Sequence, residues 1–362
     1  MDPRLFRPLF AGPIDIIGDV HGELGALHDL LAALGYDRGG EHPRGRRLVF
    51  IGDLCDRGED SPGVVSFVED LVSRGLAQCL LGNHELNLLC GSRKEGNGWF
   101  FDEDHDQAAG KFTRSRRAAG PQQQERFLAF FDSLPLALER TDLRLVHAAW
   151  DEAAITLLRD CQASPLELYR AYQDRARDIA RQSGLNEKAA AEWRRHGAQL
   201  HDPAATVPLL EHMGRLDTHY QMANPVRIAT SGPEALAPRT FYASGKWRMV
   251  ERLTWWQRYR QMTPVLVGHY WRWPTAALRE RFSRGEHDLF EGTGHDEWHG
   301  LRRNVYCLDF GVGARYRERA GGRSSTFETR LGAVRWPERE LVTDDGARRP
   351  LRPGLPEATA SG

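Results

Sequence analysis

Lysine is scarce in this chain of 362 residues: four lysines stand among 49 basic residues, and the rest are arginine. An arginine at any one position is therefore a weak indicator of function. The chain also lacks an excess of either charge, because the 49 basic residues face 50 acidic ones. Its overall charge favours neither nucleic acid nor an anionic membrane as a partner, so any anion must be bound by a local cluster of charges.

Long apolar runs are missing as well. No segment approaches the ~20 apolar residues that cross a bilayer, and residues 1–13 are charged and broken by proline rather than apolar like a secretory leader. The five cysteines form no CxxC pair, which argues against both a disulfide framework and a zinc cluster. We therefore predict a cytoplasmic globular protein with reduced, buried thiols and no membrane partner.

Short apolar runs alternate with helical patterns in the first third of the chain. Residues 14–17, 48–51 and 79–81 have the pattern of buried strands, and leucines spaced three or four apart between 24 and 34 mark one face of a helix. This alternation is typical of an α/β protein. Strand patterns return later, at 143–147, 264–267, 304–309 and 329–336.

The domain organisation follows from where these strand patterns stop. From 151 to about 200 the pattern is helical. We predict a core made of residues 1–150 and 263–337, a mainly helical insertion over 151–262, and a loose polar tail over 338–362.

One segment of the predicted insertion, 245–256, mixes cations with aromatic residues. It suggests an amphipathic helix with its tryptophans buried and its arginines in water. The functional alternative is that Lys246, Arg248 or Arg252 contacts a substrate phosphate, a role that suits the planar guanidinium of arginine.

Polar residues that can bind a metal follow several of the predicted strands. They belong to Gly18–Gly22 (GDVHG), Gly52–Gly58 (GDLCDRG), Gly82–Glu85 (GNHE), His147 and His269. In open α/β sheets ligands bind beyond the carboxyl ends of the strands, so these segments are expected to converge on one site. Mixed carboxylate, imidazole and amide donors suit manganese, iron or zinc better than an all-oxygen calcium or magnesium site. Each residue alone is more often a turn aspartate or a core histidine, but the set together favours a dinuclear metal site.

These motifs, in this order, resemble the signature of the PPP-type, calcineurin-like metallophosphoesterases. The resemblance covers about 14–150 and 264–310. It implies an α/β fold, a β-sandwich of mixed sheets flanked by helices, here with a mainly helical insertion. The surroundings of GNHE, of His147-Ala-Ala-Trp and of Gly-His269-Tyr-Trp are similar to those of bacterial, stand-alone members, which are largely uncharacterised. The protein phosphatases of the family usually have His-Gly-Gly where this chain has His147-Ala-Ala, which argues against a eukaryotic-type protein phosphatase.

The resemblance also implies roles for the motif residues. The implied metal ligands are Asp19 and His21 for the first ion, Asp53 as the bridge, and Asn83, His147 and His269 for the second ion.

The catalytic roles implied by the resemblance fall to three further residues. His84 would protonate the leaving oxygen, Asp56 would orient His84, and Arg57 would clamp the phosphate. The candidate substrate contacts are Arg57, Asn83, Arg248 and Arg252.

The implied activity is hydrolysis of phosphomonoesters by in-line attack of a hydroxide that bridges two divalent ions, with manganese favoured over iron or zinc. The substrate would be a phosphorylated small molecule, a nucleotide or a phosphoprotein. Two alternatives stay open. One is a dinucleoside polyphosphate hydrolase with the same chemistry, and the other is a non-catalytic protein that binds a phosphate ligand.

Overall fold

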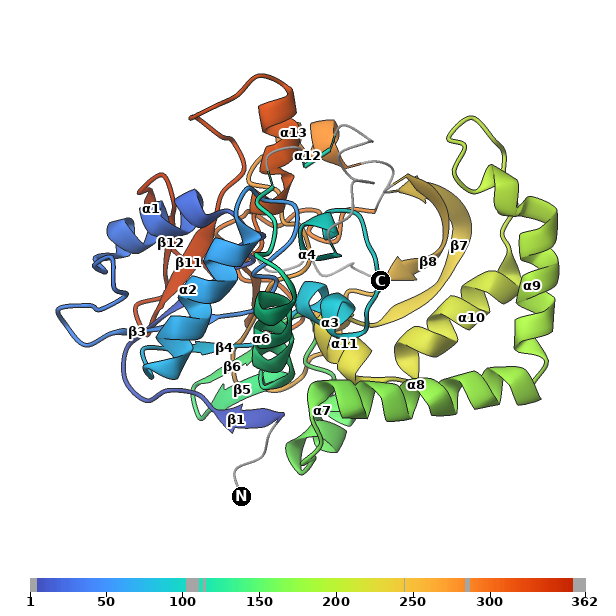
Figure 1. Cartoon of the computed structure of the whole chain (residues 1–362), viewed down its shortest axis with the longest axis horizontal. Coiled ribbons are helices and arrows are strands. Elements are labelled where there is room, and N and C mark those ends of the chain that lie inside the picture. Colours follow the sequence, from blue (N-terminus) through green and yellow to red (C-terminus); the bar gives the residue numbers. More distant parts are fainter. Residues whose placement is uncertain (1–4, 102–110, 113–114, 244, 284–286, 354–362) are drawn as a thin grey trace, which may run out of the picture.

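The computed structural model describes residues 5–101, 111–112, 115–243, 245–283 and 287–353 of the chain. Two mixed β-sheets form a sandwich flanked by helices, which confirms the predicted α/β class (Figure 1). The first sheet has the order β1 (Phe6–Pro8), β5 (Ala137–Arg140), β6 (Leu143–Val146), β9 (Val265–Val267) and β10 (Val305–Cys307). The second has the order β13 (Arg348–Pro350), β12 (Glu340–Thr343), β11 (Gly332–Trp336), β2 (Ile14–Ile17), β3 (Arg47–Phe50) and β4 (Ala77–Cys79).

The strands that precede the motif residues are paired in parallel. Strands β2, β3 and β4 are parallel to one another, as are β6, β9 and β10, whereas β11, β12 and β13 add antiparallel strands at one side of the second sheet. Because parallel strands end at the same edge, the residues that follow them are brought together.

Side chains of β2 alternate between two cores. Ile14 and Ile16 pack between the two sheets, with Leu145 of β6 and Val334 of β11. Ile17 faces the other way, into the core beneath the helices. A strand with both faces buried must be apolar nearly throughout, which is why its sequence pattern was readable.

The three motif loops connect strands of the second sheet to helices. They lead from β2 to α1 (Leu24–Leu34), from β3 to α2 (Ser61–Ser73) and from β4 to α3 (Asn83–Leu89). At the start of α2 the Asp60 side chain accepts a hydrogen bond from the Gly63 N–H at 2.8 Å, and Pro62 suits the first turn. The remaining helices near the sandwich are α4 (Gly98–Phe101), α6 (Pro121–Asp132), α12 (Ala276–Phe282) and α13 (Arg315–Ala320).

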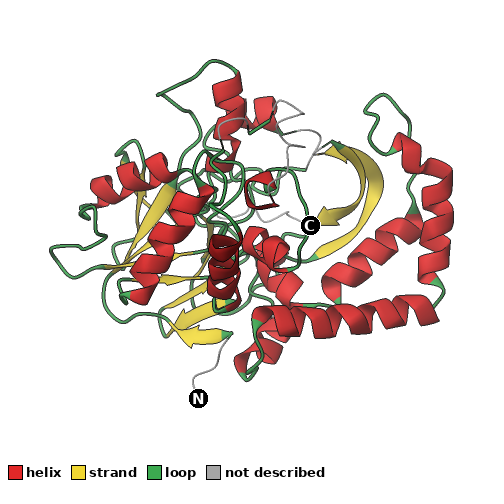
Figure 2. Ribbon diagram, in the orientation of Figure 1, coloured by secondary structure: helices red, strands yellow, loops and turns green. Residues whose placement is uncertain are grey.

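The segment that separates the two parts of the predicted core in the sequence forms helices and one hairpin, which lie to one side of the sandwich (Figure 2). The helices are α7 (Glu152–Arg159), α8 (Pro165–Gln182), α9 (Leu185–His196), α10 (Glu211–Met222) and α11 (Pro225–Ser231). Strands β7 (Glu234–Ala243) and β8 (Lys246–Arg252) pair only with each other among the described strands. The division into core and insertion at 151 and 262 stays a prediction.

The helix expected over 245–256 is wrong, because Lys246–Arg252 is strand β8. Trp247 and Met249 stand two residues apart and pack into the same small apolar cluster with Leu200. That spacing of two is the period of a strand, and it was hidden by the cations between the apolar residues.

The loose tail expected from 338 is wrong over its first part. Residues 340–343 and 348–350 form β12 and β13, which extend the second sheet. Leu341 and Val342 are buried there. Because β11 already provides an edge on which β12 can pair, these two apolar residues are enough to hold β12 in the sheet. Residues 354–362 of the predicted tail lie outside the described residues.

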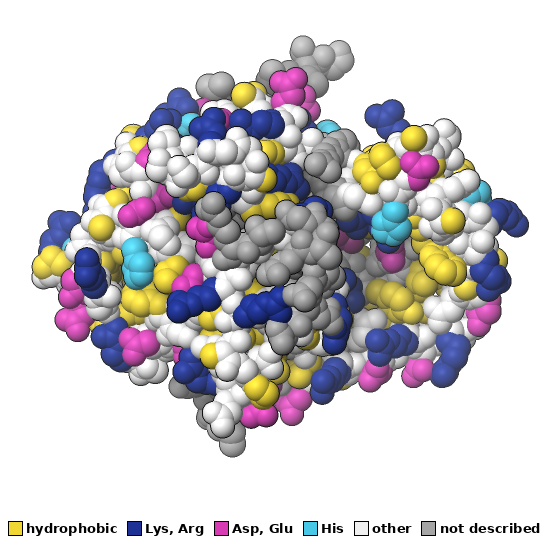
Figure 3. Space-filling view, turned by 45° about the horizontal axis from the view of Figure 1, so that its top comes forward, with side chains coloured by type: hydrophobic (Ala, Val, Ile, Leu, Met, Phe, Trp, Pro, Cys, Tyr) yellow, Lys and Arg dark blue, Asp and Glu magenta, His cyan; other side chains and the backbone are white. Residues whose placement is uncertain are grey.

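No helix in the described part of the chain is both long and apolar enough to span a membrane. Basic and acidic side chains are interspersed over the face drawn in Figure 3, as the net charge of −1 suggests.

Candidate active site

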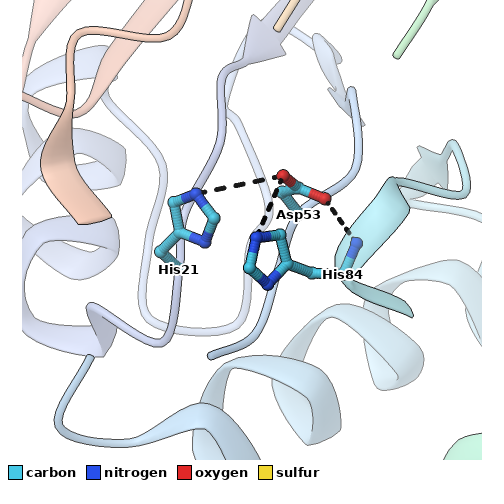
Figure 4. Close-up of side chains that lie close together, drawn as sticks. All are labelled: His21, Asp53 and His84. Carbon is cyan, nitrogen blue, oxygen red and sulfur yellow. Dashed lines mark hydrogen bonds and ion pairs between the residues drawn. The ribbon is translucent and has the colours of Figure 1, made fainter. Parts of the chain in front are cut away.

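Two groups of potential metal ligands meet at the strand ends, and Asp53 belongs to both. One group is His21, Asp53 and His84 (Figure 4), and the other is Asp53, His147 and His269; within each group the candidate ligand atoms lie within 4.8 Å of one another. Asp53 follows β3 and points one carboxylate oxygen at each group. Its Oδ2 is 3.9 Å from His21 Nε2 and 4.0 Å from His84 Nε2, and its Oδ1 is 3.3 Å from His147 Nε2.

The other predicted ligands lie beside these two groups. Asp19 Oδ2 is 4.0 Å from His21 Nε2. The side-chain oxygen of Asn83 is 3.2 Å from His147 Nε2 and 2.7 Å from His269 Nδ1. The structure therefore brings all six predicted ligands to one place, although the grouping by distance alone puts His84 beside His21.

Residues far apart in the sequence touch directly in this site. The backbone N–H of His269 donates to Asp19 Oδ2 at 3.0 Å, across 250 residues of sequence. Gly268 and Gly82 make such approaches possible. A Cβ at Gly268 would collide with the Asp19 carboxylate, and one at Gly82 would collide with Asp53.

Backbone carbonyls fix the orientation of two imidazoles. His21 Nδ1 lies 3.1 Å from the Cys55 carbonyl, and His147 Nδ1 lies 2.7 Å from the Ile51 carbonyl. A carbonyl only accepts, so Nδ1 carries the proton in both rings and Nε2 of each ring faces the carboxylates. Burial, followed by the charge of Arg57, holds the pKa of His21 well below its usual range, which leaves a lone pair on Nε2.

Buried negative charge makes this cluster a fit for cations. The pKa of Asp19 is raised by burial and then by Asp309, which is also fully buried. Burial opposes a charge on His147, but Asp53 and Asp19 outweigh it and raise the pKa of His147 to about 10. The cluster therefore attracts positive charge, as expected of groups that would surround metal ions.

Two unpartnered atoms support the same conclusion. His269 Nε2 and Asp309 Oδ2 are buried and have no hydrogen-bond partner within the described ranges. Short contacts between the acceptor oxygen of Asn83 and ring nitrogens of His147 and His269 would repel unless a cation or a proton lay between them. The donor set of carboxylate, imidazole and amide suits divalent transition metals.

The motif loops have a strained backbone at these positions. Positive φ angles occur at His21 (48°), Asp53 (50°), Asp56 (74°), Arg57 (71°) and His269 (66°). A side chain in this region costs roughly 1 kcal/mol, and such residues gather at functional sites where the surrounding structure holds them.

The predicted catalytic residues form a chain of contacts beside the ligands. His84 Nδ1 is 2.6 Å from Asp56 Oδ2, and the indole N–H of Trp99 donates to the other oxygen of Asp56 at 2.6 Å. Arg57 places one guanidinium nitrogen 2.9 Å from His21 Nε2 and the other 3.0 Å from His84 Nε2. The guanidinium thus lies against both rings.

The two arginines of β8 differ in position. Arg252 lies near His269, whose pKa is lowered first by burial and then by the charge of Arg252. Its guanidinium carbon is 5.9 Å from the centroid of the Tyr270 ring. Arg248 donates to the Ala243 carbonyl at 3.2 Å on the hairpin itself. The structure brings Arg252, rather than Arg248, beside the ligand cluster.

Two buried carboxylates of the site were missed in the sequence. Glu85 accepts hydrogen bonds from the N–H groups of Asp53 (2.9 Å), Leu54 (2.8 Å) and Gly82 (3.0 Å), and so ties two motif loops together. Asp309 follows β10, and burial raises its pKa to about 6. A signal for Asp309 was present, because it is a polar residue after an apolar strand, like the predicted ligands.

Cys55 lies within a motif but behind the ligand cluster. It is fully buried, its Sγ is 3.3 Å from Glu85 Oε1, and burial followed by the charge of Asp56 raises the pKa of its thiol well above the usual range. A neutral buried thiol is a poor nucleophile. We expect Cys55→Ser, which keeps a donor to Glu85, to leave kcat/KM within roughly twofold of wild type. Detection of a phosphocysteine intermediate by mass spectrometry would contradict this expectation.

The fold and the paired ligand groups define a metal-dependent hydrolase that acts on phosphoesters. Residues 12–211 match the family model of the calcineurin-like phosphoesterases, and the chain belongs to that family. The general chemistry of the family is phosphoester hydrolysis at a dinuclear metal site.

Similar proteins of known name match over part of their length. The bis(5'-nucleosyl)-tetraphosphatase PrpE [asymmetrical] of Oceanobacillus iheyensis is 50% identical over 74 residues, which cover 20% of this chain and 30% of that protein. The protein of the same name from Bacillus velezensis is 33% identical over 139 residues, covering 37% and 55%. The chain thus spans between 30% and 55% of these relatives.

Among solved structures, a cold-active protein-tyrosine phosphatase of a Shewanella species is 15% identical with a TM-score of 0.47, over 96% of this chain and 82% of that one. A putative diadenosine tetraphosphatase is 18% identical with a TM-score of 0.42, over 94% of this chain and 96% of that one.

Proposed function

We propose that the chain hydrolyses phosphomonoesters at a site for two divalent metal ions. The proposed ligands are Asp19, His21 and Asp53 for one ion and Asp53, Asn83, His147 and His269 for the other. The observation that carries the proposal is the position of Asp53, whose two carboxylate oxygens each face a separate group of ligands. We favour manganese, with iron or zinc as alternatives suited to the same donors.

Two divalent ions, when bound, lower the pKa of water and stabilise negative charge on phosphoryl oxygens. In the proposal Arg57 clamps the phosphate, because its planar fork matches two oxygens. The lone pair of His21 Nε2 that Arg57 contacts is the one a metal would use. A metal ion bound at His21 would therefore displace the Arg57 guanidinium from that nitrogen, and the guanidinium could then bind an anion. Arg252, Asn83 and, further out on the hairpin, Arg248 are the additional proposed substrate contacts.

The proposed proton donor is His84. The Asp56 carboxylate, held by the Trp99 N–H, accepts a hydrogen bond from His84 Nδ1 and so orients the ring with Nε2 toward the site. In the proposal Nε2 of that ring delivers the proton to the leaving oxygen, which requires the Arg57 N–H that lies 3.0 Å from Nε2 to turn to the phosphate.

The second candidate substrate is a dinucleoside tetraphosphate. It is favoured by the activity for which the relatives are named, since they share up to 50% identity with this chain over 74 residues. The bond broken would be a phosphoanhydride, and the same ligand groups suit its attack.

One assay separates these proposals from a non-catalytic role. We expect protein stripped of metal to be inactive, and protein reloaded with manganese to turn over a phosphate substrate. Inorganic phosphate from p-nitrophenyl phosphate supports the monoesterase. A nucleoside triphosphate plus a monophosphate from a dinucleoside tetraphosphate supports asymmetrical cleavage, and two diphosphates would indicate symmetrical cleavage. Absence of turnover on every substrate by the reloaded protein would refute both and leave a phosphate-binding protein.

A further inference from the structure

An aromatic side chain with no assigned role borders the proposed phosphate clamp. Trp271 follows His269 by two residues in the segment that leaves β9, and it is half-buried. The guanidinium carbon of Arg57 is 5.0 Å from the centroid of the Trp271 ring. The indole therefore lies directly beside the group that the proposed function assigns to the phosphate.

The indole N–H of Trp271 differs from those of three other tryptophans near the site. Trp99 donates to Asp56, Trp255 donates to the Ala148 carbonyl, and Trp273 donates to Ser283 Oγ at 3.1 Å. Trp271 has no hydrogen-bond partner in the part of the chain that the structure describes, and its nitrogen is not among the buried unpartnered atoms. This indole nitrogen is therefore open to solvent rather than bonded to the protein, and a ligand can reach it.

Neighbouring side chains hold the ring in place. The Trp273 ring lies 5.1 Å away, edge to face at 81°, and Trp273 packs in turn against Phe282 at 5.5 Å. Arg317 of α13 lies 5.9 Å from the Trp271 ring and donates to the Phe282 carbonyl at 3.0 Å. A half-buried indole with two guanidinium groups near its ring is thus an aromatic surface in a cationic setting.

Such a surface suits one part of a phosphate substrate. A nucleobase stacks well on an aromatic ring because every base has a π-face, and the negative phosphates attached to it match the nearby guanidinium groups. A sugar phosphate without a base offers the charge but no flat ring. The arrangement therefore discriminates between two substrates that carry the same phosphate.

We propose that Trp271 is a subsite for the nucleobase of a nucleoside phosphate whose phosphate lies at Arg57. The inference rests on the proposed function for the place of the phosphate, and it narrows the substrate class to nucleotides. It applies equally to a nucleoside monophosphate and to one end of a dinucleoside polyphosphate.

The test compares adenosine 5'-monophosphate with ribose 5-phosphate, which differ only by the base. Their dissociation constants are measured by calorimetry on manganese-loaded protein with Trp271 intact, Trp271→Ala or Trp271→Phe, each in the slow His84→Asn background so that the ligands are not hydrolysed during the titration. Stacking changes affinity by about 5- to 150-fold. We expect Trp271→Ala to weaken binding of the nucleotide within that range and that of ribose 5-phosphate less than twofold, and Trp271→Phe to retain most of the affinity. Trp193→Ala, at a tryptophan 59% exposed on α9, is the matched control and should change neither.

The contrary outcomes are distinct. Equal weakening of both ligands by Trp271→Ala would mean that the indole only supports Arg57, and no change would mean that no base contacts it. If Trp271→Ala weakened the binding of aryl phosphates such as p-nitrophenyl phosphate alone, the group that stacks on the indole would be a phenyl ring and not a nucleobase. Because binding is measured, these results are readable even if the wild type turns over no substrate, which would refute the proposed function alone.

Discussion

Asp53→Asn is expected to lower turnover by roughly 10³-fold or more and to leave the protein with one bound metal ion or none. The substitution removes a buried negative charge and turns one carboxylate oxygen into an amide N–H₂ group. Oδ2 faces His21 in one ligand group, and Oδ1 faces His147 in the other. Whichever oxygen the amide N–H₂ replaces, one of the two groups loses its carboxylate oxygen. Loss of several kcal/mol of charge stabilisation by the ions corresponds to a rate loss of this size. Steady-state kinetics and elemental analysis measure the two effects.

The matched control is Asp174→Asn, the same chemical change at an exposed residue of α8 that pairs with Arg177 on the surface. It should keep wild-type turnover and metal content, because a surface ion pair contributes little. Circular dichroism checks that Asp53→Asn is folded. Full activity of Asp53→Asn with two bound ions would refute the bridging role.

His84→Asn should slow hydrolysis of alkyl phosphates by about 10²- to 10⁴-fold, the usual contribution of a positioned proton donor. The loss should be smaller for p-nitrophenyl phosphate, because nitrophenolate is a stable leaving group and needs little protonation. Both metal ions should remain if His84 is not a ligand. The measurement is the ratio of wild-type to mutant kcat/KM across a series of leaving groups of increasing pKa.

Asp56→Asn provides the companion variant. Asp56 acts through His84, so its loss should show the same dependence on the leaving group but a smaller effect. A ratio that does not vary with the leaving group would count against proton donation by His84. Loss of a metal ion in His84→Asn would instead make His84 a ligand, as its distance to His21 and Asp53 would permit.

The central strands of the fold were predictable because they are buried on both faces. Residues 14–17 were predicted from an apolar run and coincide with β2. The hairpin strand β8 was not, because only alternate residues such as Trp247 and Met249 are packed, and the cations between them imitate a helix face. Strand β12 was missed for a related reason, since its two buried residues stand in a polar surrounding.

For the site, the sequence was sufficient to collect the ligands but not to describe their support. All six predicted ligands lie together, because each follows a strand that ends at the same edge. That Glu85 ties two loops through three backbone N–H groups depends on the folded path of the chain. The position of Trp271 beside Arg57 likewise joins segments more than 200 residues apart, which no local pattern records.

The contact between Asp19 and His269 has a consequence for how the protein is made. On the ribosome, the first three motifs are complete when fewer than a hundred residues have been synthesised, yet the last predicted ligand follows β9, which pairs with β6 before β10 can add to it. Long-range strand pairing of this kind forms late, because the intervening chain must first be closed into a loop. A nascent chain therefore presents Asp19 and Asp53 before His269 exists, so the proposed metal site can be completed only after β9 has paired with β6.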